Sequence, residues 1–593
     1  MSVQRTLCGS PRAAGHGDTI TVYGWVDHRR DHGGLVFLDL RDTSGLLQVV
    51  IHPETSPGAH AAVHGVRLEW VLRVRGELRR RDPSNINPKL ATGEVELHAS
   101  ECEVLAASRT PPFAVNEDTD VDEHLRLRHR YLDLRRPRLQ HNLRARARFI
   151  AGLRSTMTDQ GFLEIETPQL IRATPEGARD YLVPSRVNVG SFYALPQSPQ
   201  LYKQLSMVAG LDRYFQIARC FRDEDLRADR QPEFTQLDME MSFVDEEDIF
   251  AVLEMALATA WSEAGFRGGI ATPFPRITWH DAMERYGVDK PDTRFTMELG
   301  DLTAVARGCA FRVFADVAAA GGVVRGISVP GGDDLTRGDI EGELTAIARA
   351  AGARGLAYLW RRADSWQSAI ARFFTDSELE AIGHTLETGV GDLVLMVADR
   401  PPVAAAALGA LRNHLGRMRR LYDPERLDVL WVTDFPMFEA GEDGAVVPLH
   451  HPFTMVHADD VGFLDTDPLR VRSRAYDIVL NGREVGSGSI RIVNRDTQMR
   501  VFAALGIDAG EARRKFGFLL EAFEYGVPPH GGFAAGIDRL VMEGLGEESI
   551  RDVIAYPKNQ QAQEVMTGAP ATVEPSQLTD LGIALRPPAA PRP

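Results

Sequence analysis

The chain has 593 residues, more than one compact core usually contains, so three or four domains are expected. Hydrophobic residues make up 44% and charged residues 25%, as in ordinary globular proteins, which argues against a disordered or low-complexity chain. No run of about 18 apolar residues lacks charge, and residues 1–10 contain no hydrophobic segment typical of a secretory signal. We therefore expect neither a membrane span nor export.

The formal net charge of −16 does not by itself favour a nucleic-acid partner, because phosphate contacts need Lys and Arg. The arginines are clustered, however: nine of them and a single acid, Asp133, lie between Arg126 and Arg148, and Arg79–Arg81 form a second group. Such clusters are either solvated surface or local RNA-binding patches. The four cysteines are scattered and form no CxxC pair, which is typical of reduced thiols in a cytoplasmic protein.

Residues 1–107 have the pattern of a small β-barrel. Turn signals such as Gly33-Gly34 and Ser44-Gly45 separate short apolar or alternating runs. The runs are Ile20–Val26, Val36–Leu40, Leu46–Ile51, Val71–Val74 and Val95–Val104. Five short strands in about 100 residues fit an OB-fold, a barrel that often binds single-stranded nucleic acid, although a generic β-barrel has the same pattern.

The rest of the chain predicts a multidomain α/β protein. Residues 108–135, with Pro111-Pro112 and an acidic run, form a hinge, and a long helix is expected over Pro137–Gln160. Strands and helices alternate through residues 136–286 and return in 424–560. The Ala- and Gly-rich stretch 287–423 differs in character and is predicted to be an inserted α+β domain that splits the body, while residues 561–593 form a tail.

The segment Arg219–Phe243 carries the clearest chemistry. It predicts a strand, a charged loop and a return strand, and the chain has no P-loop that would bind ATP in another way. Arg222, where the first strand ends, can form paired hydrogen bonds to a phosphate. Glu224 lies on the same face of the extended chain and can accept from an adenine amino group, and Phe234 offers a ring on which a base can stack. A charged hairpin without function is the alternative.

This arrangement resembles motif 2 of class II aminoacyl-tRNA synthetases, and the chain resembles the bacterial aspartyl-tRNA synthetases over most of its length. GFLEIETPQL (Gly161–Leu170) is similar to motif 1, which builds the dimer interface in that family, and GGFAAGIDRL (Gly531–Leu540) is similar to motif 3. The resemblance implies a catalytic domain made of an antiparallel sheet flanked by helices, an N-terminal anticodon-binding OB-fold, and a GAD-type insertion that begins at KPDTRF (Lys290–Phe295).

The resemblance also implies site residues for aspartate and ATP. Buried cations held by acids suit a substrate that carries a side-chain carboxylate. The predicted aspartate site comprises Glu176, Ser198, Gln200, Lys203, Arg222, Asp238, His450 and Arg491. The predicted ATP site comprises Arg222, Asp223, Glu224, Gln231, Phe234, Glu484, Gly536, Ile537, Asp538 and Arg539. Of these, Arg222, Arg539 and Glu484 are the expected catalytic residues. Asp477 and Glu484 are the expected ligands of Mg²⁺, which prefers oxygen ligands.

The resemblance further implies RNA partners and an assembly. Arg29, Phe37 and Gln48 are expected to contact the anticodon, and His32 and Ser84 to set tRNA range. In this family RRDHGG tends to accompany enzymes that charge both tRNA-Asp and tRNA-Asn, whereas Leu in place of His32 tends to accompany strict ones. We therefore expect a cytoplasmic homodimer that charges both tRNAs and depends on an amidotransferase to convert Asp-tRNA-Asn.

Three alternatives remain. A strict enzyme would charge tRNA-Asp only, and His32 would then merely occupy a turn. An asparaginyl or lysyl relative would share the fold, but Lys203, Asp238 and Arg491 together oppose it. A non-catalytic RNA-binding paralogue would use the barrel alone, which does not explain Arg222, Glu484 and Arg539.

Overall fold

The computed structural model describes residues 5–117, 119–173, 178–226, 229–441 and 444–586, and these form two compact units. The first unit is Met1–Gln140 and the second is His141–Pro593. The boundary falls inside the long helix α4, Pro137–Asp159, which begins and ends close to its predicted bounds. In the described part of the chain, no helix is both long enough and apolar enough to cross a membrane.

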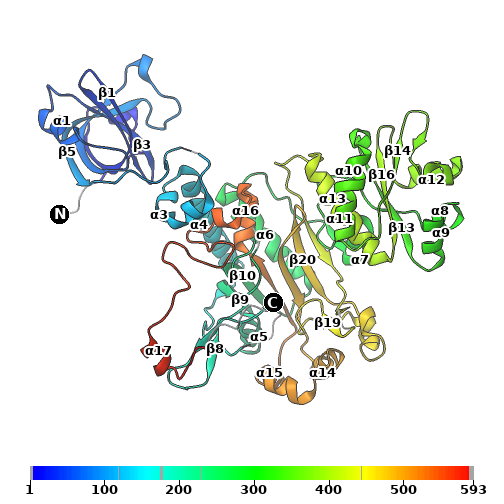
Figure 1. Ribbon diagram of the computed structural model, residues 1–593. Helices are drawn as coiled ribbons and strands as arrows, with labels where there is room; N and C mark the ends of the chain where they lie inside the picture. The colour runs from blue at the N-terminus through cyan, green and yellow to red at the C-terminus, as the bar shows by residue number, and fades with distance from the viewer. Residues whose placement is uncertain (1–4, 118, 174–177, 227–228, 442–443, 587–593) are drawn as a thin grey trace. The chain divides into compact units, whose positions relative to one another are not determined.

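The N-terminal unit contains the predicted barrel, which is closed in the strand order β1-β2-β3-β5-β4 (Figure 1). Alternate residues of the strands point inward and form the barrel core, including Val22, Leu38, Val49 and Leu72. Its strands are Thr19–His32, Leu35–Asp42, Gly45–Ile51, Val71–Arg80 and Val95–Ala106. The OB-fold prediction is therefore confirmed. Two short helices follow in the same unit, α2 (Glu123–Arg128) and α3 (Arg130–Asp133).

The second unit is built around an eight-stranded sheet of order β11-β17-β20-β21-β22-β10-β9-β6. Its six central strands are antiparallel, and only the edge strands β11 and β6 pair in parallel. The central strands are β17 (Val429–Thr433), β20 (Ala475–Leu480), β21 (Arg483–Ile490), β22 (His530–Gly536), β10 (Glu233–Ser242) and β9 (Arg213–Phe221). The edges are β11 (Arg276–Thr278) and β6 (Leu163–Glu164). The predicted hairpin around Arg222 is thus β9 and β10.

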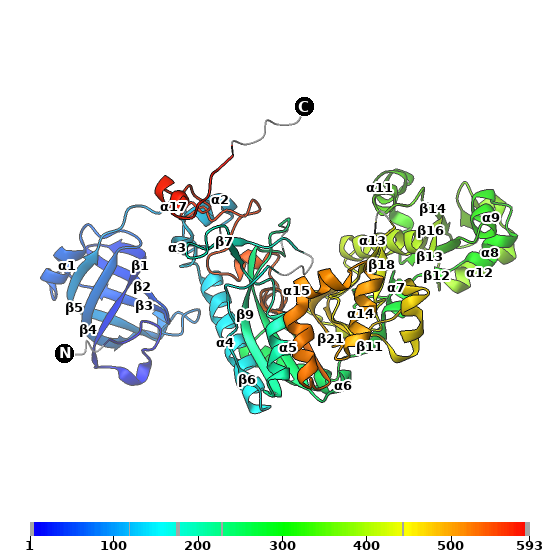
Figure 2. The ribbon, with the colours of Figure 1, turned by 90° about the horizontal axis from the view of Figure 1, so that it is seen from below.

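Helices cover the sheet and close its core. The main cluster of buried side chains joins α4, α6 (Glu246–Ala264) and α16 (Ile537–Leu545) to the sheet through Phe149, Phe250, Trp431 and Phe533. Helix α5 (Gln200–Val208) contacts β9 and β10 (Figure 2). The strand-rich body comes from two stretches of sequence, before and after the insertion. This confirms the predicted antiparallel sheet flanked by helices.

The insertion has its own five-stranded sheet, in the order β12-β13-β16-β14-β15, and its own buried clusters. Its strands are Gly300–Asp301, Val323–Val329, Leu393–Asp399, Ala357–Arg361 and Trp366–Gln367 in that order. Its main helices are α8 (Thr303–Gly308), α9 (Arg312–Ala319), α11 (Thr345–Ala350), α12 (Asp376–Thr385) and α13 (Pro401–Met418). The predicted α+β character of residues 287–423 is thereby observed, and the GAD-type assignment stays a prediction.

Gly532 of β22 stands directly opposite Glu240 of β10. A Cβ atom built there would lie 1.9 Å from Glu240 Oε2 and 2.3 Å from the backbone oxygen of Met239. Gly532→Ala should therefore lower the free energy of unfolding by about 1–3 kcal/mol or more, because the backbone cannot yield cheaply. Thermal melting followed by circular dichroism measures this loss.

Gly517 on α15 (Ala509–Ala522) provides the control, since an added Cβ there would meet only Arg513 Cγ at 3.6 Å. Gly517→Ala should be neutral or stabilising, as Ala favours helix over Gly. Equal melting temperatures for both variants would contradict the close contact at Gly532.

Candidate active site

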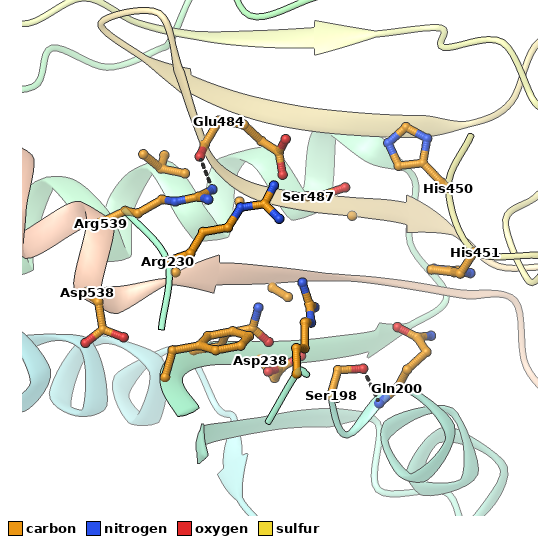
Figure 3. Close-up of a pocket in the computed structure, with 18 of the residues that line it drawn as sticks. Ser198, Gln200, Arg230, Asp238, His450, His451, Glu484, Ser487, Asp538 and Arg539 are labelled. Atoms are coloured by element: carbon orange, nitrogen blue, oxygen red, sulfur yellow. Dashed lines mark hydrogen bonds between the residues drawn. The ribbon is translucent and has the colours of Figure 1, made fainter. Parts of the chain in front are cut away.

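A cavity of about 480 Å³ opens over strands β10, β21 and β22 of the large sheet. Most predicted site residues meet here although they are far apart in the sequence (Figure 3). Those lining the cavity are Ser198, Gln200, Lys203, Arg222, Glu224, Gln231, Phe234, Asp238, His450, Glu484, Arg491, Gly536, Asp538 and Arg539. The sheet therefore brings the two halves of the split body together at one site.

The floor of the cavity holds a cluster of four buried charges. Lys203 Nζ lies 3.2 Å from Asp238 Oδ1 and 3.5 Å from Glu240 Oε2. Arg491 forms a paired interaction with Glu240, with Nε–Oε1 and Nη2–Oε2 distances of 2.8 and 3.1 Å. Each of these side chains is at most 1% exposed. Two cations and two acids compensate one another, as buried charges require.

Local structure explains why the two acids share a face. Asp238 and Glu240 are two residues apart on β10, so both side chains point to the cavity side of the sheet. Lys203 comes from the first half of α5, and Arg491 follows the end of β21. The remaining nitrogen of the Arg491 guanidinium, Nη1, is also engaged. It donates to Ser489 Oγ at 2.6 Å and lies 2.5 Å from His451 Nε2.

The pKa values of the two acids shift in opposite directions for a physical reason. Burial raises the pKa of Asp238, and Lys203 only partly offsets this. Burial acts on Glu240 in the same way, but Arg491 and Lys203 together bring the pKa of Glu240 below its usual value. Burial and the nearby Arg491 also hold the pKa of His451 well below its usual range, so His451 is neutral at pH 7.

Two buried polar atoms at this floor have no hydrogen-bond partner among the described residues: Gln200 Nε2, a donor, and Asp238 Oδ2, an acceptor. Buried polar groups are rarely left unpaired, and an unpaired one costs about 1–3 kcal/mol. A donor and an acceptor on one cavity wall suit a ligand that carries both a carboxylate and an ammonium group.

The opposite side of the cavity has features suited to a nucleotide. The guanidinium carbon of Arg222 lies 5.1 Å from the centre of the Phe234 ring, a cation–π contact at the end of the β9–β10 hairpin. Glu224 accepts from Arg230 at 2.8 Å. Arg539, in the first turn of α16, donates to the backbone oxygen of Glu484 at 3.0 Å (Figure 3). Guanidinium groups in this arrangement can bind phosphates.

The predicted metal-facing acids lie close to this nucleotide side. Asp477 is buried, and its Oδ1 lies 3.5 Å from His450 Nε2 but accepts no hydrogen bond from the described residues. Ser487 stands directly across from Asp477 in the register of β20 and β21. Glu484 lies in the same strand pair and contacts Lys290 Nζ at 3.1 Å. An orphaned carboxylate oxygen and a second carboxylate fit the oxygen ligands that Mg²⁺ prefers, with further ligands from a bound phosphate.

Three of the predicted residues that the structure describes do not line the cavity: Asp223, Ile537 and Asp477. Asp223 lies 3.5 Å from Arg179 in the loop, and both side chains are exposed. Ile537 is fully buried in the core. Glu176 lies outside the described residues. Asp538 does line the cavity, but one oxygen accepts from the backbone N–H of Thr235 at 2.9 Å and the other from Arg146, which gives Asp538 a structural task.

The sequence analysis missed Glu240, His451 and Lys290. Glu240 could have been found, because two acids two residues apart in one strand must lie on the same face. His451 adjoins the predicted His450 but points to Arg491, whereas His450 points to Asp477. Lys290 had no local signal, since its partner Glu484 is 194 residues away.

In the separate barrel unit, the predicted RNA-contacting residues lie on the outer surface. His32, at the end of β1, is exposed, and its ring lies edge-on to Phe37 with 6.0 Å between centres. Arg29 lies 3.6 Å from Asp31, and Gln48 donates to Glu96 at 3.1 Å. Ser84 is exposed in the 3-10 turn Pro83–Asn85. Their contacts with RNA stay predictions.

Comparison with known families gives the class of the protein. Residues 122–560 match the class II tRNA synthetases (D, K and N), and residues 20–105 match the OB-fold nucleic acid binding domain. The chain therefore belongs to the class II aminoacyl-tRNA synthetases, enzymes that ligate an amino acid to tRNA. An asparaginyl-tRNA synthetase from Pyrococcus horikoshii, solved with asparaginyl-adenylate, has the same fold at a TM-score of 0.59 and 18% identity, covering 94% of this chain and 98% of that one.

Relatives of high sequence identity show which family within this class the chain belongs to. The chain is 54% identical to an aspartate–tRNA(Asp/Asn) ligase from Moorella thermoacetica, covering 97% of this chain and 95% of the relative. It is 52% identical to a protein of the same name from Desulfosudis oleivorans, with 98% of each chain covered. Within its class, the chain belongs to the aspartate–tRNA ligase family.

The buried charge cluster gives a prediction of stability. Glu240→Gln should lower the free energy of unfolding by about 3–5 kcal/mol, because it leaves Arg491 buried without its counter-charge. Urea denaturation measures the change. Glu524→Gln is the matched control, since Glu524 pairs with Arg495 at the surface, where such a change costs at most about 1 kcal/mol. A similar small effect of both variants would contradict the role of the cluster.

Proposed function

We propose that this protein activates L-aspartate with ATP and transfers it to the 3′ end of tRNA-Asp and tRNA-Asn. The observation that carries the choice of amino acid is the cavity floor, where Lys203 and Arg491 lie with Gln200 Nε2 and Asp238 Oδ2, two atoms that have no hydrogen-bond partner in the described part of the chain. The relatives at 54% and 52% identity bear the name of this activity.

In this proposal the two cations receive the side-chain carboxylate of aspartate. Asp238 Oδ2 accepts from the substrate ammonium, together with Ser198 and the predicted Glu176, and Gln200 donates to the α-carboxylate. The buried charges favour aspartate over asparagine, because Lys203 and Arg491 attract a carboxylate more strongly than a neutral amide. A polar mismatch of this kind can reject the wrong amino acid by roughly 10⁴-fold.

ATP would lie on the other side of the cavity. Its base would stack between the Phe234 ring and the motif 3 glycine, Gly536, with Glu224 accepting from the adenine amino group. Gln231 and Asp223 would support the loop around the nucleotide, and Ile537 and Asp538 would hold the start of α16. Arg222 and Arg539 would bind the α- and γ-phosphates. Mg²⁺, bound through Asp477 and Glu484, would supply charge neutralisation at the phosphates.

The chemistry needs no protein nucleophile. The α-carboxylate of aspartate attacks the α-phosphorus, an acyl–phosphate bond forms, and the bond to pyrophosphate breaks. The terminal ribose hydroxyl of tRNA then attacks the acyl carbon, and AMP leaves. Arg222 and Arg539 hold the reacting groups in line and stabilise the charge that develops on the phosphate oxygens.

The barrel would bind the anticodon through Arg29, Phe37 and Gln48, with stacking on Phe37. We further propose a cytoplasmic homodimer. Strand β6 is an edge of the large sheet, and its Leu163 is 53% exposed, while Leu170 and Phe243 elsewhere in the same unit are 51 and 75% exposed in the single chain. Charging of tRNA-Asn would make protein synthesis depend on an amidotransferase that converts the attached aspartate to asparagine.

Gln200→Leu tests the proposed amino-acid site. The change removes one hydrogen bond to the substrate carboxylate, so it should raise KM for aspartate by about 10- to 150-fold, equivalent to roughly 1.5–3 kcal/mol. KM for ATP should stay within about twofold, because Gln200 is placed away from the nucleotide. ATP–pyrophosphate exchange at varied aspartate and ATP measures both constants. An unchanged KM for aspartate would remove Gln200 from the site.

Aspartylation of purified tRNA-Asp and tRNA-Asn tests the tRNA range. The wild-type protein should charge both, and failure with tRNA-Asn would establish the strict alternative. His32→Leu should lower kcat/KM for tRNA-Asn more than for tRNA-Asp, by about fivefold or more, as expected when one base contact is lost. Gln48→Ala serves as the control, since a general anticodon contact should affect both tRNAs alike.

A further inference from the structure

The segment 287–299, the first part of the insertion, follows α7 (Trp279–Tyr286) and lies between α13 and the catalytic sheet. On the insertion side, the fully buried Arg412 of α13 donates to the backbone oxygens of Asp292, Phe295, Thr296 and Met297 at 2.9–3.0 Å. The same guanidinium stacks on Phe295, with 4.1 Å from its carbon to the ring centre. A single arginine of the insertion therefore fixes the path of this segment.

The other side of the segment meets the β20–β21 hairpin and the start of β17. Thr293 Oγ1 donates to Asp428 at 3.2 Å, and Asp292 packs against Gly482, where an added Cβ would lie 3.0 Å from the Asp292 Cβ. Lys290 Nζ reaches the carboxylate of Glu484 at 3.1 Å. The insertion thus delivers one ammonium group to a carboxylate that lines the catalytic cavity.

We propose that Lys290 is a positioning residue that holds the Glu484 carboxylate and competes for it with the divalent cation that accompanies ATP. This inference rests on the proposed function, which places the cation at Asp477 and Glu484. The proposal gives the insertion a role in the reaction. Arg412 of α13 fixes the segment 287–299, and this segment places Lys290 beside Glu484.

The charges around the two acids support this competition. Asp477 faces His450 at 3.5 Å, and Glu484 faces Lys290 at 3.1 Å. Arg539 donates to the backbone oxygen of Glu484 and pairs with Asp229 at 3.3 Å. Lys290 also lies 3.7 Å from Asp289. Lys290 is therefore the cation in direct contact with the Glu484 carboxylate within the described residues. Removing its charge leaves the site more negative and strengthens the attraction for a cation.

The test is a titration of the full-length protein with Mn²⁺, followed by electron paramagnetic resonance, in the presence of a non-hydrolysable α,β-methylene ATP. Mn²⁺ replaces Mg²⁺ at oxygen ligands and gives a direct binding signal. Lys290→Gln should lower the dissociation constant for Mn²⁺ by roughly three- to tenfold, between the effects of an exposed and a buried ion pair. Lys290→Arg, which keeps the charge, should stay within about twofold of wild type.

Lys515→Gln is the matched control, because Lys515 pairs with Glu511 on the surface of α15 at 2.6 Å. It should leave Mn²⁺ affinity unchanged. Arg412→Lys should shift the affinity in the same direction as Lys290→Gln, and the double variant should show no further shift if both act through one contact. Melting temperatures measured alongside separate this binding effect from a loss of fold.

Unchanged or weaker Mn²⁺ binding by a folded Lys290→Gln protein would overturn the inference and leave the proposed function intact. An additive effect of Arg412→Lys in the Lys290→Gln background would overturn the route through the insertion. No Mn²⁺ binding by the wild-type protein with the ATP analogue would instead overturn the proposed nucleotide site itself.

Discussion

The buried ion pairs between Lys203, Arg491, Asp238 and Glu240 are the interaction on which the rest of the site depends. A buried charge without a partner costs several kcal/mol, so the four groups are stable only when β10, α5 and the end of β21 hold them at contact distance. The antiparallel register that sets Glu240 opposite Gly532 is what makes room for this cluster. The packing of the sheet and the recognition of the amino acid therefore depend on the same buried charge cluster.

The floor of the cavity and its nucleotide side carry different chemical groups. The floor carries balanced charges, and Gln200 Nε2 and Asp238 Oδ2 find no partner among the residues that the structure describes, which suits a small zwitterion with a further carboxylate. The nucleotide side carries Arg222 stacked on Phe234 and, beyond it, Arg539 beside Glu484. Because the residues of both walls lie on strands of the same sheet or on helices and loops next to it, the sheet fixes the distance between the two substrates. Catalysis by positioning follows from this rigidity, without a protein nucleophile.

Patterns within short segments predicted much of this structure. Alternating residues predicted the five barrel strands, and the hairpin around Arg222 predicted β9 and β10, although β1 and β4 extend beyond the predicted runs. Contacts between distant segments could not be predicted in this way. Asp238 was identified with its partner Lys203, but the pairing of Arg491 with Glu240 spans 251 residues and depends on the register of β22. The contact between Lys290 and Glu484 likewise exists only once the insertion is folded.

The most direct test of the central claim compares two non-hydrolysable adenylate analogues by isothermal titration calorimetry. The analogues carry either an aspartyl or an asparaginyl group and differ only in the side-chain carboxylate or amide. If the buried cations receive the carboxylate, the aspartyl analogue should bind at least about 100-fold more tightly, equivalent to about 2.7 kcal/mol. Equal affinities for the two analogues would contradict the account.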